Sequence, residues 1–195
     1  RFVDRWTVFY ADMLRLRAPA EGGAAAIAWV HQALSDEMPH DEICRRLITT
    51  NGKAGAAPEV AFVLGDQADP MALAGVTSQV FMGVRISCAQ CHDHPFDVWT
   101  QENFYGFAAY FGKTQRIENQ FTRTIYAKEN ETSTVLWPPE GKAKPSERKP
   151  VKPAFPFDMV AASETPEYIA KFNTLRAKQK AEKDALLAKS NSKDA

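Results

Sequence analysis

Residues 69–92 read DPMALAGVTSQVFMGVRISCAQCH. Asp69 followed by Pro70 predicts a helix start, because aspartate can cap the free amides of a first turn and proline suits the first helical position. Apolar side chains then recur every three or four residues, a spacing that predicts one buried helical face. The members of this stripe are Leu73, Val76, Val80, Val84, Cys88 and Cys91. We therefore expect a helix that begins at Asp69-Pro70 and carries both cysteines on its apolar stripe.

The stretch ends in Cys88-Ala-Gln-Cys91-His92, which has the C-x-x-C-H spacing of covalent haem attachment. Two thiols three residues apart can reach the two vinyl groups of one porphyrin, while the adjacent imidazole ligates the iron from one face. We predict haem c as the cofactor, with Cys88 and Cys91 as covalent anchors and His92 as the axial iron ligand. A haem on the apolar stripe would lie against buried hydrocarbon, which raises its reduction potential.

The same cluster permits other interpretations. Cys88, Cys91, His92 and His94 together offer four ligands for zinc or another metal in a structural module, although structural zinc sites usually draw on two separated pairs. A thioredoxin-like redox pair would need a βαβ pattern around the motif, and none is evident. The two cysteines can also be purely structural. We expect His94, with Asp93, to support the site from outside the iron or to ligate a neighbouring metal.

Stretches around the motif are similar to those of a known family. They read SQVFMGVR at 78–85, CAQCHDHPFD at 88–97, WTQ at 99–101 and YGFAAYF at 105–111. The chain resembles the uncharacterised C-x-x-C-H domain of large planctomycete-type cytochrome proteins. The resemblance implies a secreted protein, periplasmic or extracellular, in which this domain lies between a cytochrome c-like module and a second uncharacterised domain.

Further side chains are candidates for contact with the haem. We expect the aromatic rings of Trp99 and Phe104 to pack against it and help set its potential. The sequence does not identify the ligand on the opposite face of the iron, and five-coordinate iron is one alternative. Candidates for that ligand are His31, His40, Met13 and Met82. Each of these four also has an ordinary packing or surface role as its alternative.

Two classes of function fit such a site. In the first, which we favour, the chain is an electron-transfer domain that exchanges single electrons with a redox partner protein or a neighbouring haem domain. In the second it is the haem module of a redox enzyme, with the chemistry at open iron or in another domain. A strong sixth ligand on the opposite face of the iron would favour electron transfer, and a vacant polar pocket on that face would favour an enzyme.

Composition sets broader limits. A chain of 195 residues with 45% hydrophobic content can build one sizeable core. The formal net charge is zero, so there is no electrostatic case for nucleic acid or an anionic membrane as partner. No membrane span is visible in this segment. Cys44 is the one cysteine outside the motif, and we expect it to be a small buried apolar residue.

The pattern of the whole chain predicts a mainly α fold, an irregular helical domain with one small β-hairpin. We expect helices over 2–17, 22–34, 41–49 and 100–111, the last capped by Thr100, and turns over 50–68. The hairpin is expected within 122–137, turning at 128–131. We divide the chain into a helical haem-binding domain (1–137), an extended Pro-rich linker (138–165) and a charged C-terminal helix (166–195). That helix is either solvated or a contact for protein assembly.

Overall fold

The computed structural model describes residues 1–156 and, beyond them, residues 174, 177, 178, 180 and 181. Residues 1–156 form one compact unit, and 157–195 form a second. The described positions of the second unit are helical, and the rest of the predicted C-terminal helix lies outside the described residues. Among the described helices, none combines the length and the apolar character that crossing a bilayer requires.

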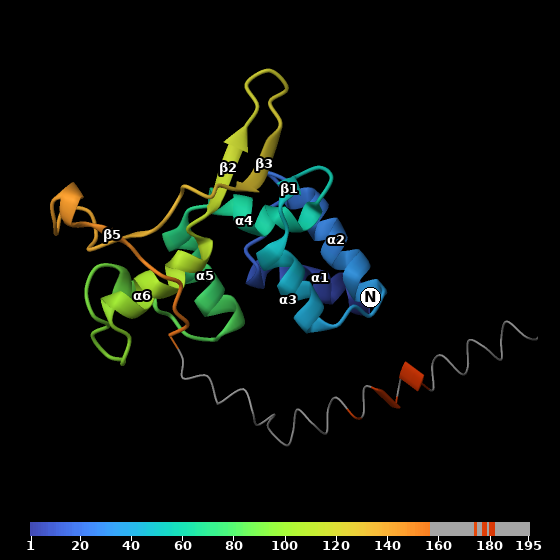
Figure 1. Ribbon diagram of the computed structural model, residues 1–195. Coiled ribbons are helices and arrows are strands. Elements are labelled where there is room, and N and C mark those ends of the chain that lie inside the picture. The colour runs from blue at the N-terminus through green and yellow to red at the C-terminus, as the bar shows by residue number, and fades with distance from the viewer. Residues whose placement is uncertain (157–173, 175–176, 179, 182–195) are drawn as a thin grey trace, which may run out of the picture. The chain divides into compact units, whose positions relative to one another are not determined.

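The first unit is mainly α-helical (Figure 1), which confirms the predicted fold class. Its helices are α1 (Phe2–Met13), α2 (Gly23–Ser35), α3 (His40–Thr49), α4 (Ala61–Gly65), α5 (Pro70–Phe81) and α6 (Gln101–Ala108). The unit also contains short 3-10 turns: η1 (Pro58–Val60), η2 (Ser87–Gln90), η3 (Ala109–Phe111) and η4 (Pro145–Glu147). The region 50–68, predicted as turns, holds η1 and α4. We missed α4 because five apolar-rich residues are too few to display a helical period.

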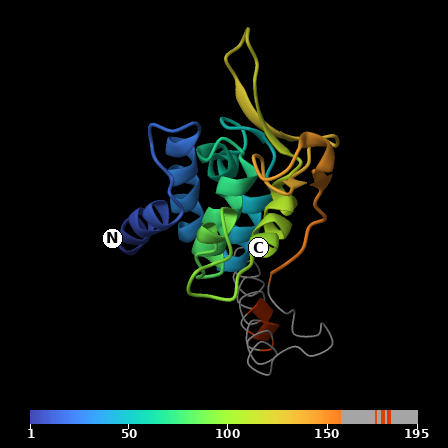
Figure 2. The same ribbon diagram turned by 90° about the vertical axis from the view of Figure 1, so that its left-hand side faces the viewer.

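Two small antiparallel sheets complete the unit. The first has the order β1 (Gly52–Lys53), β3 (Ile125–Glu129), β2 (Thr114–Glu118), and the second pairs β4 (Leu136–Trp137) with β5 (Lys149–Pro150). The β2–β3 hairpin projects from the helices in both views (Figures 1 and 2). The hairpin predicted to turn at 128–131 is therefore wrong in position. Its turn is at 119–124, where the Asn119 side chain accepts hydrogen bonds from the Phe121 and Thr122 amides.

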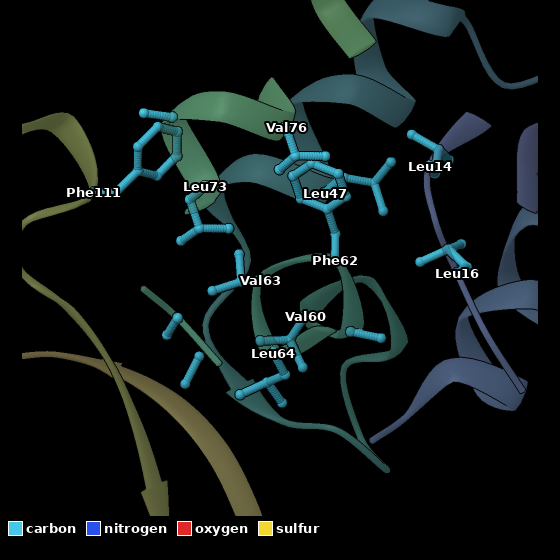
Figure 3. Close-up of a cluster of buried hydrophobic side chains, with 14 of the residues drawn as sticks. Leu14, Leu16, Leu47, Val60, Phe62, Val63, Leu64, Leu73, Val76 and Phe111 are labelled. Carbon is cyan, nitrogen blue, oxygen red and sulfur yellow. The ribbon is translucent and has the colours of Figure 1, made fainter. Parts of the chain in front are cut away.

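The hydrophobic core gathers around α4 and α5 (Figure 3). Leu73 of α5, Leu64 of α4, Leu47 of α3 and Phe104 of α6 all have no exposed surface. Burying one such side chain stabilises the fold by about 1.5–3 kcal/mol relative to leaving it in water. This core holds α5 and α6 against each other and thereby sets the position of the motif between them.

Helix α5 begins as predicted. The Asp69 carboxylate accepts hydrogen bonds from the amides of Met71 and Ala72 at 3.3 and 3.2 Å, and Pro70 is the first helical residue. The helix ends at Phe81, because Gly83 adopts a left-handed conformation (φ 70°) and the Val84 amide bonds back to the Ser78 carbonyl. The prediction that one helix continues to Cys88 and Cys91 is therefore wrong.

The compact unit extends to Pro156, beyond the domain boundary predicted at residue 137. The Val151 amide donates to the Val135 carbonyl, and the Ala154 amide donates to the Gly106 carbonyl of α6. A Cβ on Gly106 would come within 3.1 Å of the Ala154 Cβ, so the glycine permits this close approach. The first part of the predicted linker thus lies on the helical domain.

We predict that Asp69→Ala lowers the free energy of unfolding by about 1 kcal/mol, because the first turn of α5 loses both capping bonds. Urea denaturation followed by circular dichroism measures the change. Asp69→Asn is the matched control and should retain most of the stability, since an amide oxygen also caps. Equal losses in the two variants would contradict the capping role.

Candidate functional site

Cys88 lies in the 3-10 turn η2 and Cys91 is the residue that caps its C-terminal end, between α5 and α6. Ile86 and Ala89, three residues apart, are buried with 1% and 0% of their surface exposed. A 3-10 helix has three residues per turn, so side chains at i and i+3 eclipse each other. Cys88 and Cys91 share the same spacing and are both exposed. The turn therefore presents both thiols to solvent on one side, and the prediction that they continue a buried stripe is wrong.

Close packing holds this turn against α5. A Cβ on Gly75 would approach the Ser87 Oγ to 2.8 Å, so the glycine leaves room for this side chain where η2 meets the helix. Helix α6 also packs against η2. The turn is thus held from two sides, while its outer side is open.

Side chains from two distant segments bind the backbone of the motif. The Gln101 Nε2 donates to the Gln90 carbonyl at 2.8 Å, and the Lys142 Nζ donates to the Cys91 carbonyl at 2.9 Å. Lys142 also donates to the Gln101 Oε1 at 3.0 Å, which links the two supports. The Asp93 Oδ1 accepts from the Gln101 amide at 2.7 Å. Together these bonds tie residues 90–93 to the start of α6.

The start of α6 is itself well defined. The Thr100 Oγ1 accepts from the Asn103 amide at 3.1 Å and the Asn103 Oδ1 accepts from the Thr100 amide at 2.9 Å, a reciprocal capping box. This confirms the predicted cap. The Asp93 carboxylate lies at the same helix end, where the helix dipole favours a negative charge.

The imidazole of His92 has a defined tautomer. Its Nδ1 lies 2.7 Å from the Asp93 carbonyl oxygen. A carbonyl can only accept, so Nδ1 carries the proton and Nε2 carries the lone pair. His92 is exposed. The hydrogen bond to the Asp93 carbonyl thus leaves the Nε2 lone pair of His92 available to bind a metal ion.

His94 has the opposite tautomer. Its Nδ1 accepts a hydrogen bond from the Phe96 amide at 3.3 Å, which leaves the proton on Nε2. Its own backbone amide donates to the Trp99 carbonyl at 2.8 Å. These two hydrogen bonds of His94 stabilise the loop between η2 and α6. Its Nε2 carries a proton and can donate a hydrogen bond, whereas the Nε2 of His92 carries a lone pair.

The aromatic residues predicted to contact a haem differ in accessibility. Trp99 is half-buried, and its Nε1 donates to the Asp97 Oδ2 at 2.9 Å. Phe104 is completely buried in the core and packs against Tyr105 at a centroid distance of 5.8 Å. Of the two predicted residues, only Trp99 has surface available beside the motif. Phe96 and Val98 of the same loop are strongly exposed and were missed by the sequence interpretation.

A hollow of about 520 Å³ lies along α6 near the motif. Tyr105 and Trp137 contribute aromatic walls, with ring centroids 5.0 Å apart, and Lys149 and Lys152 are among its charged lining residues. Burial raises the pKa of Tyr105, and the negative charge that Cys91 carries as a thiolate raises it further. The hollow therefore has a wall close to the second cysteine.

The remaining predicted ligands are engaged elsewhere. His31 Nε2 lies 3.3 Å from the Asp4 Oδ1, and His40 contacts Tyr10 and Cys44. In Figure 1, α3 lies on the other side of α5 from the loop that follows η2. Met13 and Met82 are partly buried against the core. Within the described residues, no three His, Cys, Asp or Glu side chains are grouped closely enough to hold a metal ion.

Gln101 and Lys142 were not identified from the sequence. The Thr100-x-x-Asn103 pattern marks the start of α6, but nothing in it assigns Gln101 to the Gln90 carbonyl. Lys142 lies 51 residues after Cys91 in the chain. The connection between β4 and β5, in which Lys142 lies, brings it to the motif.

One family model matches the chain. It is PSCyt2, described as "Protein of unknown function (DUF1549)", and it matches residues 1–116, which include η2 and α6. At the level of the family, this agrees with the resemblance to a cytochrome-associated domain. No curated protein and no solved structure matches the chain.

We predict that Lys142→Met loosens the motif, because the carbonyl of Cys91 and the amide oxygen of Gln101 lose their shared donor. Each lost bond is worth about 1 kcal/mol. Hydrogen exchange measured by mass spectrometry should therefore become faster in residues 88–100. The control is Lys152→Met, which removes another exposed lysine of the same segment. Unchanged exchange in Lys142→Met would contradict the supporting role.

Proposed function

The chain belongs to the PSCyt2 family of proteins of unknown function (DUF1549), and from this premise we propose that it is a c-type haem-binding electron-transfer domain of a secreted or periplasmic multidomain protein. One observation carries the proposal. Cys88 and Cys91 share the outer side of η2, directly before a histidine whose Nε2 lone pair is available. The proposed location outside the cytosol follows from haem attachment and is tested by cell fractionation.

The donor set suits a covalently attached haem. Both thiols are exposed, so a porphyrin can approach them without unfolding the turn. The buried side chains of Ile86 and Ala89 anchor the turn in the core. Lys142 donates a hydrogen bond to the Cys91 carbonyl, and Gln101 donates one to the Gln90 carbonyl. In the proposed function Cys88 and Cys91 anchor haem c, and His92 ligates its iron through Nε2. A bound haem supplies one-electron transfer.

The other residues of the loop hold and shield such a group. His94 supports the loop conformation, and its Nε2 proton makes it a hydrogen-bond donor rather than a second ligand. The exposed Phe96 and Val98 and the half-buried Trp99 supply apolar surface next to the motif. Apolar cover limits water near a haem and raises its reduction potential.

We favour electron transfer over a structural zinc module and over a redox enzyme. A compact zinc site needs His94 and His92 as ligands together with both thiols, but the His94 Nδ1 lone pair is used by the Phe96 amide. An enzyme with its chemistry at the iron needs a substrate site there, and the hollow along α6 is lined by Tyr105 and Trp137 rather than by the motif. The proposed partner is a redox protein or a neighbouring haem domain.

We predict that the chain, produced by a host with a haem-attachment system, is heavier by one haem in denaturing mass spectrometry. A pyridine haemochrome spectrum should report the type of attachment. Cys88→Ala/Cys91→Ala should carry no covalent haem, because both thioether bonds are lost. Cys44→Ala is the matched control and should be loaded like the parent. An unmodified mass for the parent chain in that host would overturn the proposal.

We also predict separable roles for the two motif histidines. His92→Ala should keep the covalent haem but change its spin state in the optical spectrum, since the axial ligand is lost. His94→Ala should keep both haem and spin state and shift the reduction potential, because outer residues tune a site without forming it. Loss of all bound metal in His94→Ala, with no haem detected in the parent, would instead favour the four-ligand zinc site.

A further inference from the structure

Helix α1 presents an aromatic face to solvent. Phe2, Trp6 and Phe9 have 70%, 41% and 53% of their surface exposed. The ring centroids of Phe2 and Trp6 are 6.0 Å apart, and those of Trp6 and Phe9 are 5.3 Å apart. Another face of the helix packs on the unit, because Thr7 and Ala11 are buried and α1 contacts α2. A contiguous exposed apolar patch of this kind marks an interaction site.

The exposed residues have the spacing of a seam between two helices. Phe2, Trp6, Phe9 and the partly buried Met13 follow one another at intervals of four, three and four residues. This is the alternation of the a and d positions in a heptad, which lets two helices interlock along a shared line. A helix that lies in a membrane surface needs no such repeat, so the pattern favours another helix as occupant. Figure 2 shows α1, in dark blue, at the outer edge of the helical unit.

Two charges beside the seam indicate which helix fits. Arg5 and Asp12 are seven residues apart and flank the seam on the same side, at successive g positions when Trp6 is an a position. A two-fold axis perpendicular to the plane of two antiparallel helices brings this flank of one helix beside the same flank of the other. Arg5 then lies beside Asp12 of the second copy, and the symmetry repeats the pair. Helix α1 is therefore complementary in charge to an antiparallel copy of itself.

The two charged side chains are available for this contact. Arg5 and Asp12 are both exposed. Within the part of the chain that the structure describes, neither side chain takes part in an ion pair or a hydrogen bond. Asp4, which lies outside the seam, is instead engaged with His31 at 3.3 Å. An antiparallel second copy would thus supply the partners that Arg5 and Asp12 lack.

We propose that α1 is the contact through which two copies of this chain form an antiparallel, two-fold symmetric dimer. Phe2, Trp6 and Phe9 form its apolar centre, and Arg5 and Asp12 form ion pairs at its edge. Aromatic side chains supply most of the energy of such contacts. One short helix per copy buries less area than a permanent dimer needs, so monomer and dimer exchange. The contact goes beyond the proposed function, because it shares no residue with the motif and does not depend on haem.

The test is sedimentation equilibrium of the full chain, in a reducing buffer that prevents disulfide cross-links. We expect a mass that rises with concentration from 21.7 kDa toward twice that value. Arg5→Glu should weaken dimerisation about tenfold, because both ion pairs become repulsive. Asp12→Arg should weaken it similarly, and the double variant Arg5→Glu/Asp12→Arg should restore it. Both changes suit the helix dipole, which favours an anion near the N-terminus and a cation near the C-terminus, so the helix is retained.

Matched controls separate the seam from other surface effects. Arg17→Glu reverses an exposed arginine beyond the end of α1 and should dimerise as the parent does. Phe9→Ser should abolish dimerisation, whereas Phe121→Ser, at the exposed turn of the β2–β3 hairpin, should not. Circular dichroism checks that each variant is folded.

Three outcomes would overturn the proposal. The first is a parent chain that stays monomeric at its highest soluble concentration. The second is a folded double variant that dimerises no better than Arg5→Glu alone, because the antiparallel register requires the restored pair. The third is binding to vesicles of phosphatidylcholine and phosphatidylglycerol by a chain that does not self-associate, which would assign the aromatic face of α1 to a lipid surface instead.

Discussion

Burial of Ile86 and Ala89 beneath η2 is the constraint on which the motif depends. These side chains anchor one side of a three-residue turn, so Cys88 and Cys91 must both occupy another side. Gly75 contributes by leaving room for Ser87 against α5. The outward thiols are thus a consequence of core packing.

Backbone hydrogen bonds then assign the chemistry of the two histidines. The Asp93 carbonyl accepts from His92, and the Phe96 amide donates to His94, so the neighbouring imidazoles hold their protons on different nitrogens. Two residues of the same type, separated by one position, therefore offer a lone pair in one case and a proton in the other. Lys142 and Gln101 preserve this arrangement by binding the carbonyl groups of the turn.

The proline-rich segment after β4 has a structural part in this site. It leaves the helical domain, pairs β5 with β4 and returns along α6, where the Ala154 amide bonds to the Gly106 carbonyl. In both views it runs beside α6 (Figures 1 and 2). Proline lowers the entropy cost of holding an extended chain, so such a segment can lie on a surface with few hydrogen bonds. The hollow walled by Tyr105 and Trp137 exists because of this return.

The sequence by itself determined the local features of this protein. The mainly α fold class, the Asp69 and Thr100 caps and the C-x-x-C-H spacing all depend on residues within a few positions of one another, where side chains act on their own backbone. It could not place the end of α5 at Gly83, because the apolar stripe continued beyond it. Tertiary structure alone decided the outward direction of the thiols, the support from Lys142 and the contact between Tyr10 and His40. These depend on which distant segments pack together, and that is set by burial of the common core rather than by any local pattern.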